Sequence, residues 1–174
     1  MSTPKTAWQA PPAGRYAIDP AGSSVRFVTR HMFGLARVRG ALAVTSGALA
    51  VTEPAEESNV EASVSAASFS TGNPVRDPQV RSRLFLDVGR HPMITFRSTA
   101  IRRSGDAWAV SGVLTVKGHP APLDLAVTDV TTEGTSLVLR AAGTVDRYAH
   151  GVTAMRGMAA RHLSVEITAR VTKA

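Results

Sequence analysis

The chain has 174 residues, of which 44% are hydrophobic, so it is long enough for one ordinary domain and too short for two large ones. It contains no cysteine, which excludes disulfide bonds and thiolate metal sites and fits a reducing compartment. The net charge of +7 suits an acidic partner, but the basic residues are scattered and no block of like charges marks a binding arm.

The N-terminal stretch through Gly14 is rich in proline, alanine and glycine and has no apolar run typical of a signal peptide. No later stretch approaches the roughly 20 apolar residues that a membrane-spanning helix needs. We therefore expect a flexible arm over residues 1–14, one domain over residues 15–174, and a cytoplasmic location.

Alternation of apolar and polar residues with a period of two predicts strands along most of the domain. Residues 24–31 place Val25, Phe27 and Thr29 on one face. Residues 37–52 read either as two strands or as one strand with a sharp bend, and residues 59–67 alternate cleanly.

Residues 73–88 break the alternation and predict a short helix. Asp77 would cap this helix, with Pro78 at its first position. Val80 and Leu84 would then share the buried face, with Phe85 beside them.

Alternation returns after this helix. Residues 93–103 place Ile94, Phe96, Ser98 and Ala100 on one face, and residues 107–117 are predicted to pair back onto them as a hairpin. Strands at 123–130 and 136–147 flank a turn at residues 133–134, and residues 162–172 form the last strand. Residues 149–161 fit neither period and predict a loop with at most a short helical turn.

These elements predict an all-β domain of eight or nine antiparallel strands with one or two short helices, either a sandwich or a closed barrel. An eight-stranded barrel either fills with side chains or holds one small ligand. Four phenylalanines, at positions 27, 69, 85 and 96, favour the first alternative. Small residues at alternating positions favour the second alternative, a barrel that holds a ligand. They are Ala62, Ala66, Ala100, Ala141, Gly143 and Ala169. The residues alone do not decide between the two alternatives.

No motif in the sequence predicts catalysis, a metal or a cofactor. The five histidines lack partners at zinc-site spacing, and nucleophile-elbow, Walker and dinucleotide fingerprints are missing. Nucleic-acid stacking is disfavoured because Arg26 beside Phe27, and Arg97 beside Phe96, would point to opposite faces of their strands.

Several stretches together resemble the YceI-like family over residues 15–172. They are residues 16–19, 23–27, 31–32, 38–40, 71–73, 76–77, 81–82, 85–88, 92, 95–98, 112–118 and 122. The resemblance implies a lipocalin-like antiparallel barrel of about eight strands, with a helix across it and an elongated apolar cavity for a polyisoprenoid or other isoprenoid-chain lipid, isoprenoid quinones included. The chain departs from the family at Gly22, where histidine is common, and over residues 146–151, where His150 stands in place of an aromatic residue.

The resemblance favours a lipid-filled cavity and predicts a carrier or sequestering protein without catalysis. The expected partners of the protein are an isoprenoid lipid, a membrane that it contacts transiently, and a second copy of the chain in a homodimer. No nucleic-acid partner is expected. The residues predicted to line or cover the cavity are Phe27, Phe33, Phe69, Phe85, Phe96, Leu114, Val116 and Met155.

Two alternatives accompany this prediction. The first is an enzyme acting on an isoprenoid or quinone, which requires His31, His119 or His150 to face the cavity beside a carboxylate. The second is a nucleic-acid or anionic-surface binder driven by the net charge.

Overall fold

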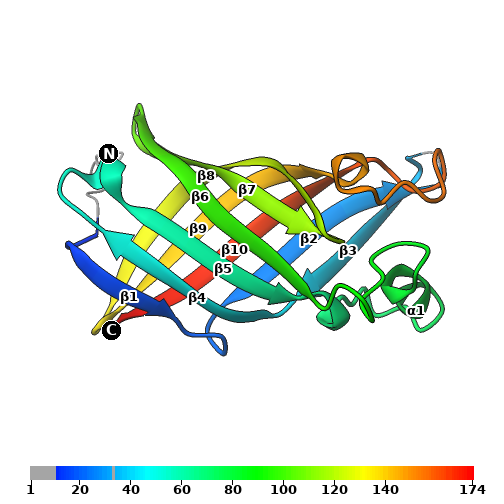
Figure 1. Cartoon of the computed structure of the whole chain (residues 1–174), viewed down its shortest axis with the longest axis horizontal. Helices are drawn as coiled ribbons and strands as arrows, with labels where there is room; N and C mark the ends of the chain where they lie inside the picture. The colour runs from blue at the N-terminus through cyan, green and yellow to red at the C-terminus, as the bar shows by residue number, and fades with distance from the viewer. Residues whose placement is uncertain (1–10, 33) are drawn as a thin grey trace, which may run out of the picture.

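The computed structural model describes residues 11–32 and 34–174, and these form one closed antiparallel barrel (Figure 1). Most connections between strands are short, as the turn signals of the sequence predict, and the longest are residues 66–92 and 147–161. The strands are β1 (Gly14–Ile18), β2 (Ser24–His31), β3 (Ala36–Leu42), β4 (Val44–Val51), β5 (Asn59–Ser65), β6 (Met93–Ser104), β7 (Ala107–Val116), β8 (His119–Glu133), β9 (Ser136–Asp146) and β10 (His162–Lys173). Among the described residues the one α-helix is α1 (Arg76–Arg81), and short 3-10 turns are η1 (Ala55–Glu57), η2 (Ala66–Ser68) and η3 (Arg147–His150).

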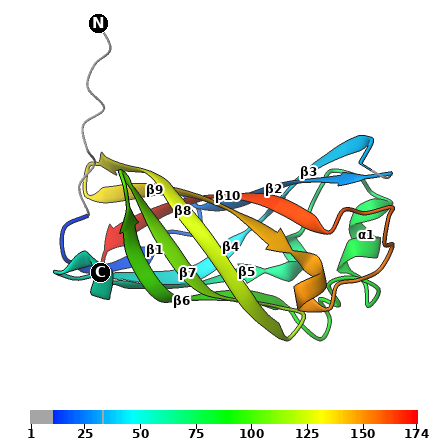
Figure 2. The ribbon, with the colours of Figure 1, turned by 90° about the horizontal axis from the view of Figure 1, so that it is seen from above.

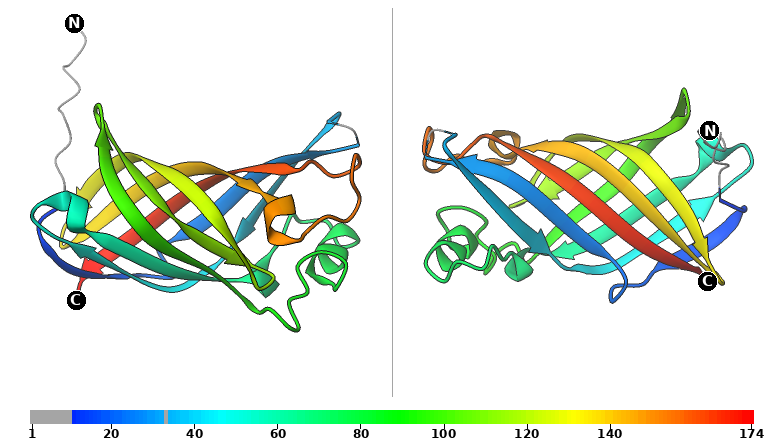
Figure 3. Two further views of the ribbon diagram at one scale, coloured as in Figure 1. Left: turned by 45° about the horizontal axis from the view of Figure 1, so that its top comes forward. Right: turned by 180° about the vertical axis from the view of Figure 1, so that it is seen from behind.

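The wall of the barrel has eight positions, although the described residues form ten strands. β1 and β2 pair with successive parts of β10, and β4 and β3 pair with β1 and β2 in turn. β1 with β2 therefore fills one position, and β3 with β4 fills the next. The other strands follow in chain order from β5 to β10, and the pairing of β1 with β10 closes the ring (Figure 3). The predicted all-β barrel of about eight strands is confirmed.

Two irregularities shape this wall. The stretch at residues 37–52 breaks at Ala43 into β3 and β4, with a register shift between Val44 and Ser46, which confirms the two-strand alternative. In β6 the register shifts between Ser98 and Ala100. Because a bulge adds one residue, the strand changes phase there, and Ile101 faces inward in place of Ala100. The prediction that Ala100 shares a face with Ile94, Phe96 and Ser98 was therefore wrong.

The helix lies at one end of the elongated barrel (Figure 2). The side-chain oxygen of Asn73 accepts hydrogen bonds from the backbone N–H groups of Val75 and Arg76, both at 2.9 Å, so Asp77 is not the cap that the sequence predicted. Asp77 lies inside the helix, buried, and accepts from the backbone N–H and the hydroxyl of Thr71. The helix ends at Arg81, which leaves Leu84 exposed rather than on its buried face.

Three hydrophobic clusters run along the barrel. One closes the end opposite α1, where Tyr16, Val51, Leu137 and Val171 are 7% exposed or less. A second lies in the middle, on β7 and β8, and the third joins Phe85 to Val116 and Val152 below α1. Within the described ranges, no helix is long and apolar enough to span a bilayer.

Candidate functional site

The barrel encloses a cavity of about 600 Å³ that runs between its walls. Its lining follows the alternation read from the sequence, because every second residue of a strand points inward. On β10 alone, five alternating residues face it: Leu163, Val165, Ile167, Ala169 and Val171. β2 contributes Val25, Phe27 and Thr29, and β8 contributes Leu123, Leu125 and Val127. A cavity of this size and apolar lining matches the space that a drug-sized or larger apolar ligand needs.

Phe27, Phe69 and Phe96 do not fill this space, because their rings lie along its wall. The ring of Phe27 covers Gly40 on the neighbouring strand and stacks on Phe69, with centroids 5.1 Å apart. The ring of Phe96 covers Gly112 in the same way. A side chain at either glycine would collide with these rings, so the missing Cβ atoms make room for the aromatic residues beside the cavity rather than within it.

Three of the six predicted small residues line the cavity, namely Ala62, Ala141 and Ala169. Gly143 points inward but is covered by Leu125, since a Cβ there would stand 2.8 Å from a Leu125 methyl group. Ala66 is buried in η2, away from the cavity, and Ala100 is displaced by the bulge in β6.

Seven of the eight residues predicted to line or cover the cavity do face it: Phe27, Phe69, Phe85, Phe96, Leu114, Val116 and Met155. Phe33 lies outside the described residues. Their contact with a ligand stays a prediction. Polar side chains line the cavity near α1, and of these only His31 and His150 had been considered as cavity residues from the sequence. The polar lining comes from Arg30, His31, Asn73, Arg76, Gln79, Arg147 and His150.

Arg147 is the most deeply buried of these cations, with 7% of its surface exposed. Its guanidinium donates to three backbone carbonyls, those of Val152 and Ala160 at 2.8 Å and that of Ala159 at 3.0 Å. It also lies over the ring of Tyr148, 4.9 Å from the centroid. Burial lowers the pKa of Arg147, because a charged group loses water there. The residue thus fixes the segment at 151–161 to the barrel.

His150 and His31 bring imidazole groups to the same lining. His150 is 3% exposed, and its Nδ1 donates to the backbone carbonyl of His119 at 2.8 Å, since a carbonyl can only accept. Nε2 of His31 lies 3.5 Å from a guanidinium nitrogen of Arg76. No aspartate or glutamate is among the described residues that line the cavity, so its polar end is cationic.

No group of three histidine, aspartate or glutamate side chains in residues 11–32 and 34–174 is placed to hold a metal ion. His119 does not line the cavity, and its Nδ1 donates to the carbonyl of Lys117 at 2.8 Å.

The YceI-like domain profile matches residues 16–172, which is nearly the whole barrel. The chain belongs to the YceI-like family. Two curated relatives are UPF0312 proteins. One, from Pectobacterium atrosepticum, is 30% identical over 116 residues, and the other, from Yersinia enterocolitica, is 31% identical over 117 residues. Each match spans 65% of this YceI-like chain and 60% of the relative's own length.

Solved structures show the same barrel at low identity. BcnA of Burkholderia cenocepacia superposes with a TM-score of 0.77 at 22% identity, over 89% of this chain and 99% of its own. A polyisoprenoid-binding domain of Saccharophagus degradans superposes with a TM-score of 0.66 at 13% identity, over 91% and 98% of the two chains. These likenesses establish the YceI-like fold of the chain.

Proposed function

We propose that this YceI-like protein carries or sequesters a polyisoprenoid or other isoprenoid-chain lipid, an isoprenoid quinone among the candidates, without chemically altering it. The observation that carries the proposal is the 600 Å³ cavity with its apolar walls. Each methylene buried there contributes about 0.8 kcal/mol, so several isoprene units are held by the lining alone. The likeness of this barrel to the polyisoprenoid-binding domain of Saccharophagus degradans supports the same ligand class.

The position of the polar lining supports one orientation of the cargo. The far end is closed by the cluster around Tyr16 and Val171, whereas Arg76, His31 and His150 line the cavity at the α1 end. An isoprenoid chain would lie along the apolar walls, with its polar head group beside these three side chains.

The alternative, an enzyme using a cavity histidine, has less support. It needs a histidine beside a carboxylate, and the described cavity lining has His31 and His150 but no aspartate or glutamate. Turnover of an isoprenoid lipid by the wild type would test this alternative. It would be supported if a His150→Ala variant still bound the lipid but had lost the turnover.

The test of the carrier function is mass spectrometry of organic extracts from the full chain purified without detergent. An isoprenoid lipid at a fixed molar ratio to protein is the expected result, and it would also identify the head group. A clean extract from well-folded protein would contradict the proposal.

The homodimer and the cytoplasmic location remain predictions. Light scattering on the same preparation tests the first, and cell fractionation tests the second. A carrier must also exchange its cargo with a bilayer, so transient membrane contact belongs to the proposed function.

A further inference from the structure

Exposed apolar side chains gather at one end of this molecule. Eight large apolar residues are exposed among the described residues, and six of them lie in three segments at the α1 end. These six are Met32 and Leu35 between β2 and β3, Val75 and Leu84 on either side of α1, and Met155 and Met158 in the segment at 151–161. We refer to these six as the apolar rim. Leu35 and Val75 are the most exposed of the six, at 86% and 80%. A group of exposed apolar residues, unlike single ones, is typical of an interaction surface.

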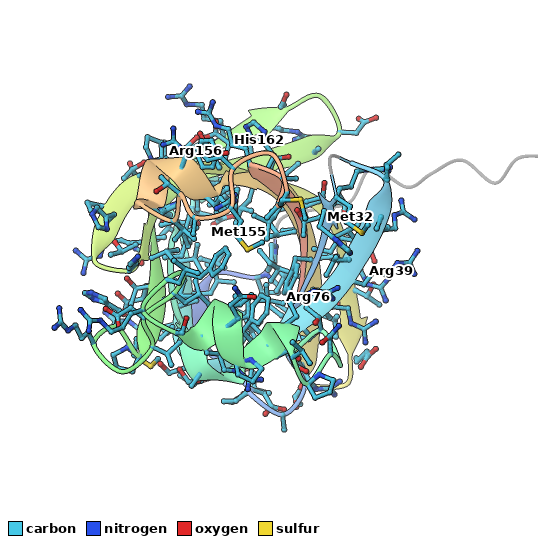
Figure 4. The ribbon with its side chains drawn as sticks, turned by 90° about the vertical axis from the view of Figure 1, so that its right-hand side faces the viewer. Met32, Arg39, Arg76, Met155, Arg156 and His162 are labelled. Atoms are coloured by element: carbon cyan, nitrogen blue, oxygen red, sulfur yellow. The ribbon has the colours of Figure 1, made fainter. Side chains whose placement is uncertain are left out.

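The three segments of the apolar rim are neighbours in space. A β-bridge joins His31 to Ala159, and a guanidinium nitrogen of Arg76 lies 3.5 Å from His31. The side-chain amide of Gln79 lies 3.8 Å from the sulfur of Met155. Figure 4 looks onto this end and shows Met32, Met155 and Arg76 around the opening of the barrel. The rim is therefore one surface rather than six scattered residues.

The rim also surrounds the mouth of the cavity. Val75, Met155 and Met158 line the cavity and are at the same time exposed to solvent. Cargo that enters or leaves between them would cross the rim. An apolar chain would then pass through water unless another apolar phase covered this end.

Charge at this end matches an anionic partner. Arg37, Arg39, Arg83 and Arg156 are exposed beside the rim, and neither ion pair of the described residues includes them. Two nearby carboxylates are engaged, because Asp77 is buried against Thr71 and Asp146 pairs with Arg161. A third, Asp87, is half-buried. At the opposite end, around η1 and the turn between β6 and β7 (Figure 1), exposed carboxylates accompany the exposed cations Arg102 and Arg103. These carboxylates are Glu53, Glu56, Glu57 and Asp106.

We propose that the apolar rim docks on an anionic lipid bilayer, with the mouth of the cavity facing the membrane. The proposal rests on the proposed function, because it supplies the surface through which a lipid carrier would exchange its cargo. A second copy of the chain is a poorer occupant, since two rims face to face would bring the arginines of both copies together. An anionic bilayer satisfies both the apolar side chains and the surrounding cations.

The test is flotation of the full chain with vesicles of phosphatidylcholine alone and of phosphatidylcholine mixed with phosphatidylglycerol. Binding to the mixed vesicles, and its decrease as salt is raised, is expected. A Leu35→Ser/Val75→Ser variant should bind about tenfold more weakly, and it should fold because both side chains are exposed. Val113→Ser is the matched control, an exposed apolar residue on β7 away from the rim.

Charge variants give an independent readout. Arg39→Gln, beside the rim, should weaken binding to the mixed vesicles. Arg102→Gln, near the last residue of β6 and far from the rim, should leave it unchanged. The proposal would be overturned if Val113→Ser weakened vesicle binding as much as Leu35→Ser/Val75→Ser, and Arg102→Gln as much as Arg39→Gln. So would light scattering in which Leu35→Ser/Val75→Ser turns a dimer into a monomer, because the rim would then bind a second copy.

Extracts of the same protein separate this proposal from the carrier function. Isoprenoid lipid in the extract with no vesicle binding would overturn the docking surface and leave the carrier function standing. Vesicle binding with a clean extract would support the docking surface and contradict the carrier function.

Discussion

Arg147 shows how a single buried cation organises the polar end of the cavity. Its replacement by methionine would leave the carbonyls of Val152, Ala159 and Ala160 without their donors. We expect the free energy of unfolding, measured with urea, to fall by about 2–4 kcal/mol. Arg156→Met is the control, because Arg156 is exposed and lies over the same Tyr148 ring, 5.0 Å from the centroid. Its loss should stay below about 0.5 kcal/mol, and equal losses would contradict the structural role of Arg147.

The ion pair of Asp146 with Arg161 makes stability depend on acid pH. Two hydrogen bonds from the guanidinium, at 2.9 and 2.8 Å, lower the pKa of Asp146 from 3.8 to about 2, against the opposing effect of burial. The folded state therefore gains stability above pH 3.8 and loses it as the pH falls towards about 2.

An Asp146→Asn variant should lose part of this acid dependence and be less stable than the wild type at neutral pH. Denaturant titrations across that range measure it. Asp124→Asn, on the exposed face of β8 and in neither ion pair of the described residues, is the control. An Asp146→Asn curve parallel to the wild type would show that the pair contributes nothing.

Among the elements, the hairpin of β2 and β3 depends on the close approach of its two strands. A Cβ at Gly40 would overlap the Phe27 ring and stand 2.6 Å from the carbonyl oxygen of Ser70. Gly40→Ala should lower the free energy of unfolding by about 1–3 kcal/mol in urea titrations. Gly89→Ala, where no atom lies within 4 Å of the added group, is the control and should change it by less than about 0.5 kcal/mol. A tolerated Gly40→Ala would mean that Phe27 moves freely from the wall.

Strand irregularities and distant side-chain partners limit what the sequence alone predicts. Alternation correctly placed the inward residues of β2 and β10, because these strands pair without interruption. In β6 it failed after Ser98, since a bulge leaves no mark in the apolar pattern. In α1, Asp77 resembled a cap in sequence, but its carboxylate satisfies the backbone of Thr71 instead, and that partner lies outside the helix.

For the whole molecule, the barrel and most of its apolar lining could be predicted from the sequence, whereas the polar mouth could not. The mouth combines His31, Arg76 and Arg147, which come from three distant segments. The pairing of β2 and β9 with the same strand, β10, and the position of α1 bring these residues to one end. The apolar rim was missed for the same reason, because Leu35, Val75 and Met155 belong to no common periodic pattern.

Filling the barrel interior with a larger side chain tests most directly whether the interior holds the lipid. Ala141 lines the cavity beside Ile167 and Val127, whereas Ala126 points outward from β8. We would measure the lipid extracted per mole of protein from Ala141→Phe and Ala126→Phe after detergent-free purification. We expect the amount to fall at least about tenfold in Ala141→Phe and to be unchanged in Ala126→Phe. Equal amounts of lipid per mole of protein in both folded variants would place the ligand outside the cavity and contradict the proposed function.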